Sequence, residues 1–244
     1  MAGAGLIGGG VGPARSLGRE TLTASSRLGS MAARMLAQRL RRRHDRDEGR
    51  DTMSNQPASI EGAYQEIAKR YPRIVQSRDG KDIQLRLMGS DDRDRMVAFA
   101  RALPSQDLLF LRRDITRAGV VNEWIRDIDA HRTFSVLAFD GEQLIGDASL
   151  HHNLLTWSRH RGEVRLVIGS EGRGHGVGRL LAEELNAIGR LLGLEMLTAQ
   201  VPFDQQTAMT VFRQLGYERE AVLADYVIAS DGITRDLLVA TYRL

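Results

Sequence analysis

The sequence predicts an α/β fold in which one mixed sheet packs on a single core, rather than a doubly wound parallel sheet. Strand and helix periods alternate between residues 82 and 244, and strands follow one another directly before the glycine-rich turn near residue 172. Asp140-Gly141 and Asp231-Gly232 each separate two apolar runs, which predicts antiparallel hairpins, the first with a type I′ turn. Between residues 164 and 192 a buried strand leads through that turn into an amphipathic helix.

The individual elements follow from periodicity and from the residues that begin and end them. Ser59 and Ser90 are predicted N-caps, and Pro72 and Pro104 end the helices that precede them. The helical region at 106–130 is expected to break near Gly119. The other expected helices are 60–71, 90–103, 180–192 and 205–216, and the strands are 82–88, 134–139, 143–151, 164–168, 194–201, 222–228 and 237–242.

We expect residues 82–244 to form one domain, preceded by a helix and linker at 56–81 and by a disordered extension at 1–55. The extension is rich in glycine, alanine, serine and arginine and lacks apolar periodicity. The extension also contains an arginine block at 39–43. A basic arm that binds nucleic acid or an anionic membrane is therefore an alternative, although a solvated extension is the favoured interpretation. An organelle transit peptide, or a true start at Met53, would also account for this composition.

Composition argues against several classes of protein. The chain has no cysteine, which rules out disulfides and a thiol nucleophile and is typical of a cytoplasmic protein. No apolar stretch approaches the roughly 20 residues that a membrane-spanning helix needs. The histidines include no H-x-x-x-H pair, so no metal is expected. A homodimer is left open.

The most informative motif is the turn Arg173-Gly174-His175-Gly176-Val177-Gly178, which opens the amphipathic helix. Backbone amides at a helix N-terminus, unobstructed by side chains, are suited to bind a phosphate or pyrophosphate. The spacing fails G-x-G-x-x-G of dinucleotide-binding folds, and no Gly-Lys pair follows as it does in nucleotide-triphosphate loops. The spacing does fit R-x-x-G-x-G, read as Arg173, Gly176 and Gly178.

This pattern resembles the pyrophosphate-binding loop of the GNAT superfamily of acyl-CoA N-acyltransferases. A second family pattern, N-x-x-A-x-x-x-Y-x-x-x-G-F, is similar in spacing to the segment that begins at Gln205 and keeps Ala208 and Gly216. Gln205 stands at the asparagine, Phe212 at the tyrosine and Tyr217 at the phenylalanine. The resemblance covers residues 82–244 and implies the GNAT fold, acetyl-CoA as co-substrate and an amine as acceptor.

The resemblance also implies roles for individual residues. The family's acidic residue near the start of the strand before the loop matches Glu163, the first candidate for the base that deprotonates the amine. His151 and His152 are alternatives, and one of them should face the cleft. The strands at 164–168 and 194–201 should separate to admit the thioester. The expected cofactor-binding residues are Leu166, Val167, Ile168, Arg173, Gly174, His175, Gly176, Val177, Gly178, Arg179, Gln205 and Phe212.

The predicted activity is transfer of an acetyl group from acetyl-CoA to an amine by direct attack in a ternary complex. Small amines, amino acids and protein lysines are all open as acceptors. Phe212 cannot protonate the departing thiolate as the family's tyrosine does, so Tyr217, Tyr226 or water would have to do so, unless the thiolate leaves unassisted. The alternative is a non-catalytic CoA-binding sensor or interaction module of the same fold.

Overall fold

The computed structural model describes residues 60–108, 111, 113–153, 156–228 and 232–244, which form one mixed sheet with helices on both faces. The strand order is β1-β2-β3-β4-β5-β6-β8-β7, and every neighbouring pair is antiparallel except β5 and β6. The strands are β1 (Arg73–Gln76), β2 (Asp82–Leu87), β3 (Thr133–Asp140), β4 (Gln143–His152), β5 (Arg161–Ile168), β6 (Met196–Pro202), β7 (Glu218–Ile228) and β8 (Thr234–Arg243).

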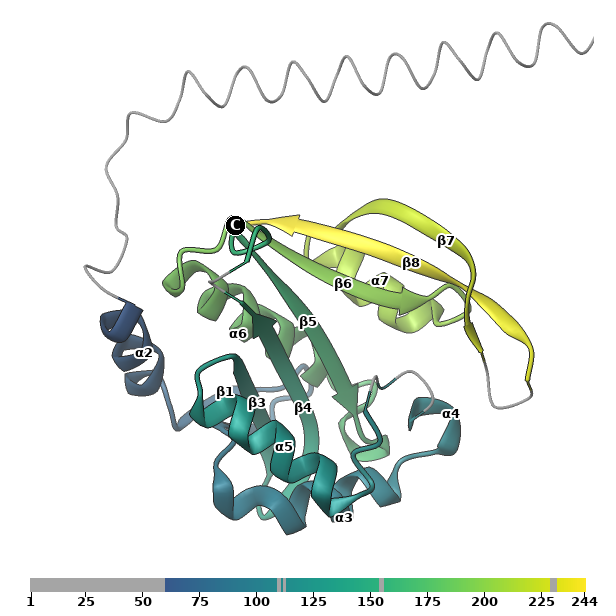
Figure 1. Ribbon diagram of the computed structural model, residues 1–244. Helices are drawn as coiled ribbons and strands as arrows, with labels where there is room; N and C mark the ends of the chain where they lie inside the picture. The colour runs from purple at the N-terminus through teal and green to yellow at the C-terminus, as the bar shows by residue number, and fades with distance from the viewer. Residues whose placement is uncertain (1–59, 109–110, 112, 154–155, 229–231) are drawn as a thin grey trace, which may run out of the picture. The chain divides into compact units, whose positions relative to one another are not determined.

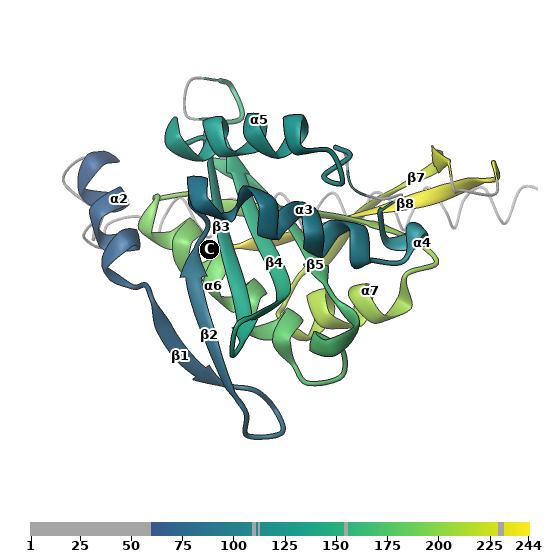
Figure 2. The same cartoon turned by 90° about the horizontal axis from the view of Figure 1, so that it is seen from below.

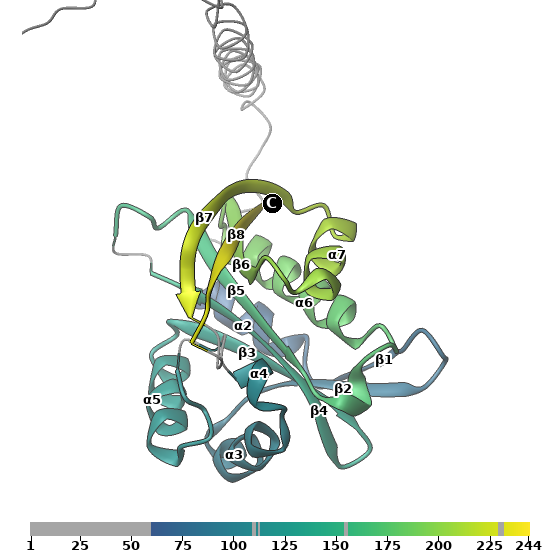
Figure 3. The same ribbon diagram turned by 90° about the vertical axis from the view of Figure 1, so that its right-hand side faces the viewer.

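Figure 3 shows α3 and α5 on one face of the sheet and α6 and α7 on the other. The central strands are therefore buried on both sides, and nearly every residue of β3 and β4 is buried, although several of these residues are polar. In β3, for example, Val136 packs with the core under α6, whereas Leu137 packs with the core under α3 and α5. The helices are α2 (Ile60–Lys69), α3 (Arg93–Ala102), α4 (Ser105–Leu108), α5 (Ala118–Asp129), α6 (Val177–Leu191) and α7 (Gln206–Gln214), with short 3₁₀ turns η1 (Ser90–Asp92) and η2 (Ser170–Gly172).

The two parallel strands diverge along their length, as Figure 1 shows. Pairing between β5 and β6 ends where Val164 lies opposite Ala199. Beyond that point β5 continues to Ile168 beside β4, while the end of β6, from Gln200 to Pro202, pairs with β8. The sheet therefore opens immediately before the turn that leads from β5 into α6, as the sequence analysis expects.

The N-terminal part of the domain contains a strand that the sequence analysis does not predict. β1 lies in the segment expected to be a linker and pairs with β2 along its whole length (Figure 2). The carboxylate of Glu184, buried on α6, accepts hydrogen bonds from Arg70 Nη2 at 3.0 Å, Tyr71 Oη at 2.8 Å and Arg73 Nη1 at 3.0 Å. These bonds fix the segment between α2 and β1 to α6.

Several local expectations are wrong in detail. Gly119 does not break a helix but lies in the first turn of α5, and the interruption falls between α4 and α5. Ser90 does not cap α3, because it lies inside η1, and Asp92 instead accepts a bond from the Gly89 amide at 3.0 Å. The β3–β4 turn has a positive φ only at Gly141, which is the pattern of a type II′ turn rather than type I′.

The expected extension at 1–55, its arginine block, the Ser59 cap and Asp231 of the closing turn lie outside the described residues. Within the described part of the chain, none of the helices combines the length and apolar character needed to cross a bilayer.

Candidate functional site

The turn between β5 and α6 is shaped by two glycines in the left-handed region. The φ angle is +79° at Gly174 and +83° at Gly176, the residue that immediately precedes α6. The Gly176 carbonyl accepts a backbone hydrogen bond from Arg179 at 3.0 Å. The amides of Val177 and Gly178 therefore precede the helix's own hydrogen bonds, and the helix dipole adds to their attraction for an anion.

The space around these glycines differs from one position to the next. A Cβ at Gly172 would lie 2.9 Å from the carbonyl oxygen of Ile145, so packing alone excludes a side chain there. A Cβ at Gly178 would make only ordinary contacts, the nearest at 3.5 Å from Ile168, and its backbone is helical. The protein itself therefore does not demand glycine at 178, and any such demand has to come from a bound group.

The basic side chains of the turn are held by acidic partners from other elements. The Arg173 guanidinium donates to Asp107 of α4 and, through Nε, to the Ile168 carbonyl at 3.1 Å. His175 Nδ1 lies 3.0 Å from Asp79 Oδ2, and the His175 carbonyl accepts a bond from the Arg78 amide at 2.9 Å. The β1–β2 turn and α4 thus brace the glycine turn from two sides.

A band of polar side chains crosses the face of the sheet that α3 and α5 cover. Residues directly opposite one another on paired strands share a face, so the register of β3, β4 and β5 fixes the members of this band. Polar groups in the middle of a two-sided core are rare unless they bind one another or a ligand. The band consists of Thr133, Ser135, Asp147, Ser149, His151, Glu163 and Arg165.

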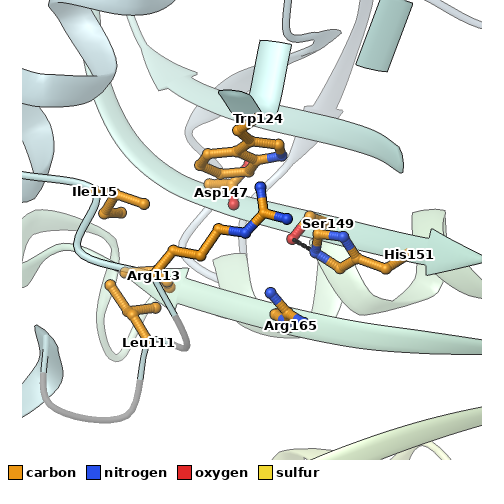
Figure 4. Close-up of a pocket in the computed structure, with 9 residues that line it drawn as sticks. Leu111, Arg113, Ile115, Trp124, Asp147, Ser149, His151 and Arg165 are labelled. Atoms are coloured by element: carbon orange, nitrogen blue, oxygen red, sulfur yellow. Dashed lines mark hydrogen bonds between the residues drawn. The ribbon is translucent and has the colours of Figure 1, made fainter. Parts of the chain in front are cut away.

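A pocket opens over the centre of this band (Figure 4). Its apolar walls come from the chain before α5, from α5 itself and from β5, while β4 supplies most of the polar groups. In Figure 4 the Arg113 guanidinium extends between Trp124 and the pair formed by Ser149 and His151. The lining residues are Leu111, Arg113, Ile115, Trp124, Asp147, Ser149, His151, Arg165 and Val167.

Asp147 is a site residue that the sequence analysis missed. The residue is 2% exposed, and its Oδ1 has no hydrogen-bond partner within the described part of the chain. Burial raises the pKa of this carboxyl well above its usual range. The available signal was a lone acid in the middle of the apolar run LIGDASL of β4, where a buried strand ordinarily carries none.

The predicted catalytic residues lie beside this pocket. Glu163 faces His151 across the β4–β5 ladder and binds Arg165 Nε at 3.0 Å. His151 lines the pocket, with Nδ1 2.9 Å from Thr133 Oγ1 and Nε2 3.1 Å from Ser149 Oγ. His152 points to the opposite face, where burial lowers its pKa and its ring stacks on Phe134. Of the two histidines it is therefore His151 that faces the pocket.

The predicted cofactor-binding residues outside the glycine turn lie in different places: one lines the pocket, and others pack in the core under α6 or stand beside α7. Val167 lines the pocket, whereas Leu166 and Ile168 pack under α6. Gln205 stands half-buried just before α7. Phe212 is buried in the core, edge-on to Tyr217 with ring centroids 4.9 Å apart.

The alternative proton donors differ in exposure. The Tyr217 hydroxyl is buried and donates to Asn186 Oδ1 at 3.0 Å, and burial raises its pKa. Tyr226, by contrast, is exposed on β7. Among the described residues, no three or more histidine, aspartate or glutamate side chains lie close enough together to hold a metal ion.

The fold and the glycine turn have a counterpart among known families. Residues 100–217 match the family described as Acetyltransferase (GNAT) family. This part of the chain is a GNAT acetyltransferase domain. The match includes β3, β4, β5, the glycine turn, α6 and α7, and by homology it identifies a GNAT-family N-acetyltransferase.

Solved structures share the same fold at low sequence identity. A GNAT-family acetyltransferase from Streptococcus pneumoniae superposes with a TM-score of 0.60 at 20% identity, covering 66% of this chain and 99% of that one. A ribosomal-protein-alanine N-acetyltransferase from Brucella melitensis gives 0.58 at 21%, covering 66% and 99%. The putative acetyltransferase yncA from Salmonella typhimurium, solved with its cofactor acetyl-CoA, gives 0.58 at 15%, covering 66% and 94%. No curated protein matches the sequence.

Proposed function

We propose that this domain transfers an acetyl group from acetyl-CoA to a primary amine, with both substrates bound at once. The observation that carries the proposal is the opening between β5 and β6 directly before the glycine turn of α6. An opened sheet edge offers backbone groups to an extended chain such as the pantetheine arm, and a helix N-terminus offers amides to the pyrophosphate. The two features follow one another along the chain in the order that CoA requires.

The conformation of the turn supports its assignment to the pyrophosphate. Gly174 and Gly176 hold backbone conformations that expose amides, and the position of Gly178 leaves room that no protein atom fills closely. Val177 and Gly178 would hold the phosphates through their amides, and the backbone of Leu166, Val167 and Ile168 would pair with the pantetheine arm. Arg173, His175 and Arg179 would frame the turn, and Gln205 would face the same arm. When bound, acetyl-CoA supplies an activated thioester.

The acceptor amine would enter from the pocket beside Asp147 and His151. An alkylamine arrives protonated at neutral pH, because its unperturbed pKa is about 10.4, so a base has to remove a proton before attack. Glu163 is our candidate base, acting through water, because it lies in the polar band where β5 and β6 still pair, just before they separate, four residues along β5 from Val167, which faces Asp147. His151 lies opposite Glu163 and would hold the acceptor side of the site in place through Ser149 and Thr133.

A second candidate function is a CoA-binding module without catalysis, which the burial of Phe212 at the family's tyrosine position favours. The deciding experiment titrates CoA into the full chain by calorimetry and then measures thiol release from acetyl-CoA against a panel of amines. Amine-dependent release supports the transferase, whereas CoA binding without release for any amine supports the module. If the chain neither binds CoA nor releases thiol from acetyl-CoA, the proposal of a CoA site is refuted.

A further inference from the structure

Charges in the pocket are unevenly compensated. Among the described lining residues, two side chains are arginines, Arg113 and Arg165, and one carries a carboxyl group, Asp147. Arg113 forms an ion pair with Asp127 at 3.0 Å, and Arg165 forms one with Glu163 at 3.0 Å. Asp147 forms no ion pair with any residue that the structure describes, although it is 2% exposed.

The surroundings of Asp147 contain further polar atoms without partners. Trp124 Nε1, in the pocket wall, and Ser135 Oγ, on the same face of the sheet, are buried and make no hydrogen bond to the described residues. Native proteins leave few buried polar groups unsatisfied, and a buried carboxyl without a partner is costly. A patch with this many open polar atoms indicates a place where a ligand supplies the missing partners.

We infer that Asp147 is the specificity-determining residue that holds the acceptor as an alkylammonium ion, the cation being either a small primary amine or a lysine side chain. The carboxyl would accept hydrogen bonds from the ammonium, and the apolar side chains of Leu111, Ile115, Trp124 and Val167 line the pocket beside it. Both arginines already have carboxylate partners, so the uncompensated group calls for a cation rather than an anion. This inference deepens the proposed function and rests on it for the identity of the reaction.

The test measures binding and stability as well as turnover. The full chain, saturated with CoA, is titrated calorimetrically with n-butylamine, and Asp147→Asn is compared with Asp91→Asn, an exposed acid outside the pocket. We expect Asp147→Asn to weaken amine binding by about 10- to 100-fold, the range for a hydrogen bond to a charged group, and Asp91→Asn to leave it unchanged. Equal amine affinity in wild type and Asp147→Asn overturns the inference.

Thermal unfolding without amine separates a ligand-binding role from a structural one. A carboxyl buried without a partner destabilises the free protein, so Asp147→Asn should melt at or above the wild-type temperature. A clear loss of stability together with unchanged amine affinity would assign Asp147 to packing. If the variant does not fold, wild-type binding of n-butylamine is compared with n-butanol, and an alcohol that binds as tightly as the amine overturns the inference.

Two further measurements identify the source of the cation and distinguish a failure of the amine site at Asp147 from a failure of the proposed acetyl transfer. A peptide with one lysine and its acetyl-lysine counterpart are titrated beside n-butylamine, so preference for the peptide identifies a protein lysine as the source. Asp147-dependent amine binding with no thiol release from acetyl-CoA would refute the transferase and keep the amine site. Turnover in which wild type and Asp147→Asn have the same KM for the amine would refute the amine site at Asp147 and keep the transferase.

Discussion

The proposed binding of CoA at the glycine turn can be tested by comparing two helices, α6 and α5, that both have glycine as their second residue. Gly178 is the second residue of α6 and Gly119 is the second residue of α5, and a Cβ meets no close protein atom at either position. An aspartate near a helix N-terminus is favourable for folding by about 0.3–1 kcal/mol. Gly178→Asp and Gly119→Asp should therefore both fold with wild-type stability or slightly more, and both change the net charge of the chain by the same amount.

The two variants should differ in their affinity for CoA. At Gly178 the new carboxylate would stand beside the proposed pyrophosphate, and two unit charges at about 4 Å repel by about 1 kcal/mol in water and about 4 kcal/mol in a half-buried setting. A loss of about 2–4 kcal/mol weakens binding by roughly 30- to 1,000-fold, while Gly119→Asp should bind CoA as wild type does. Calorimetric titration measures both affinities and thermal unfolding confirms both folds. Unchanged CoA affinity in a folded Gly178→Asp protein would refute the pyrophosphate assignment.

The remaining predictions concern the base, the core and the buried carboxyls. Glu163→Gln should lower kcat by about 100-fold or more and change the pH dependence of kcat, and a wild-type pH–rate profile would remove Glu163 from the mechanism. Phe212→Tyr should destabilise the protein by about 1–3 kcal/mol, because its hydroxyl would be buried in the core, and a gain in kcat without loss of stability would show instead that this ring faces the thiolate. Glu184→Ala should lower the free energy of unfolding by about 1–3 kcal/mol in denaturant titrations, since the bonds from Arg70, Tyr71 and Arg73 are lost, with CoA affinity unchanged; equal midpoints would contradict this. Burial raises the pKa of Asp147 in the folded state, so the wild-type protein loses folding stability as the pH rises from about 4, the unfolded pKa, toward the folded pKa. The stability of Asp147→Asn relative to wild type should therefore grow by up to about 1.4 kcal/mol per pH unit in that range. A stability difference that does not depend on pH would contradict this prediction.

Much of the fold follows from local patterns in the sequence. The alternating run of β2, the apolar runs of β3, β4 and β5 and the helical period of α6 each depend on the faces that the element buries, and those faces are visible in the residues. β1 was missed because four residues with a largely exposed pattern carry almost no periodicity. The break expected at Gly119 was misplaced because glycine is tolerated in the first turn of a helix, where few bonds depend on it.

The site was predictable only where a motif is contiguous. The turn from Arg173 to Gly178 is a local pattern that the sequence shows directly, but the spacing does not indicate that Gly174 and Gly176, rather than Gly178, take the left-handed conformation. Asp147 acquires meaning from strand register, which places it beside Val167 and beneath Trp124, residues distant in sequence. The same register decides that His151 rather than His152 faces the pocket, a choice that alternation along a single strand leaves open.

The most direct test of the account is the thiol released from acetyl-CoA by the full chain in the presence and absence of n-butylamine, with the acylated amine identified by mass spectrometry. Thiol release should require the amine, match the N-acetylated product in amount, and be lost in Gly178→Asp but kept in Gly119→Asp. Thiol release that is independent of every amine in the panel, or equal in the two glycine variants, would contradict it.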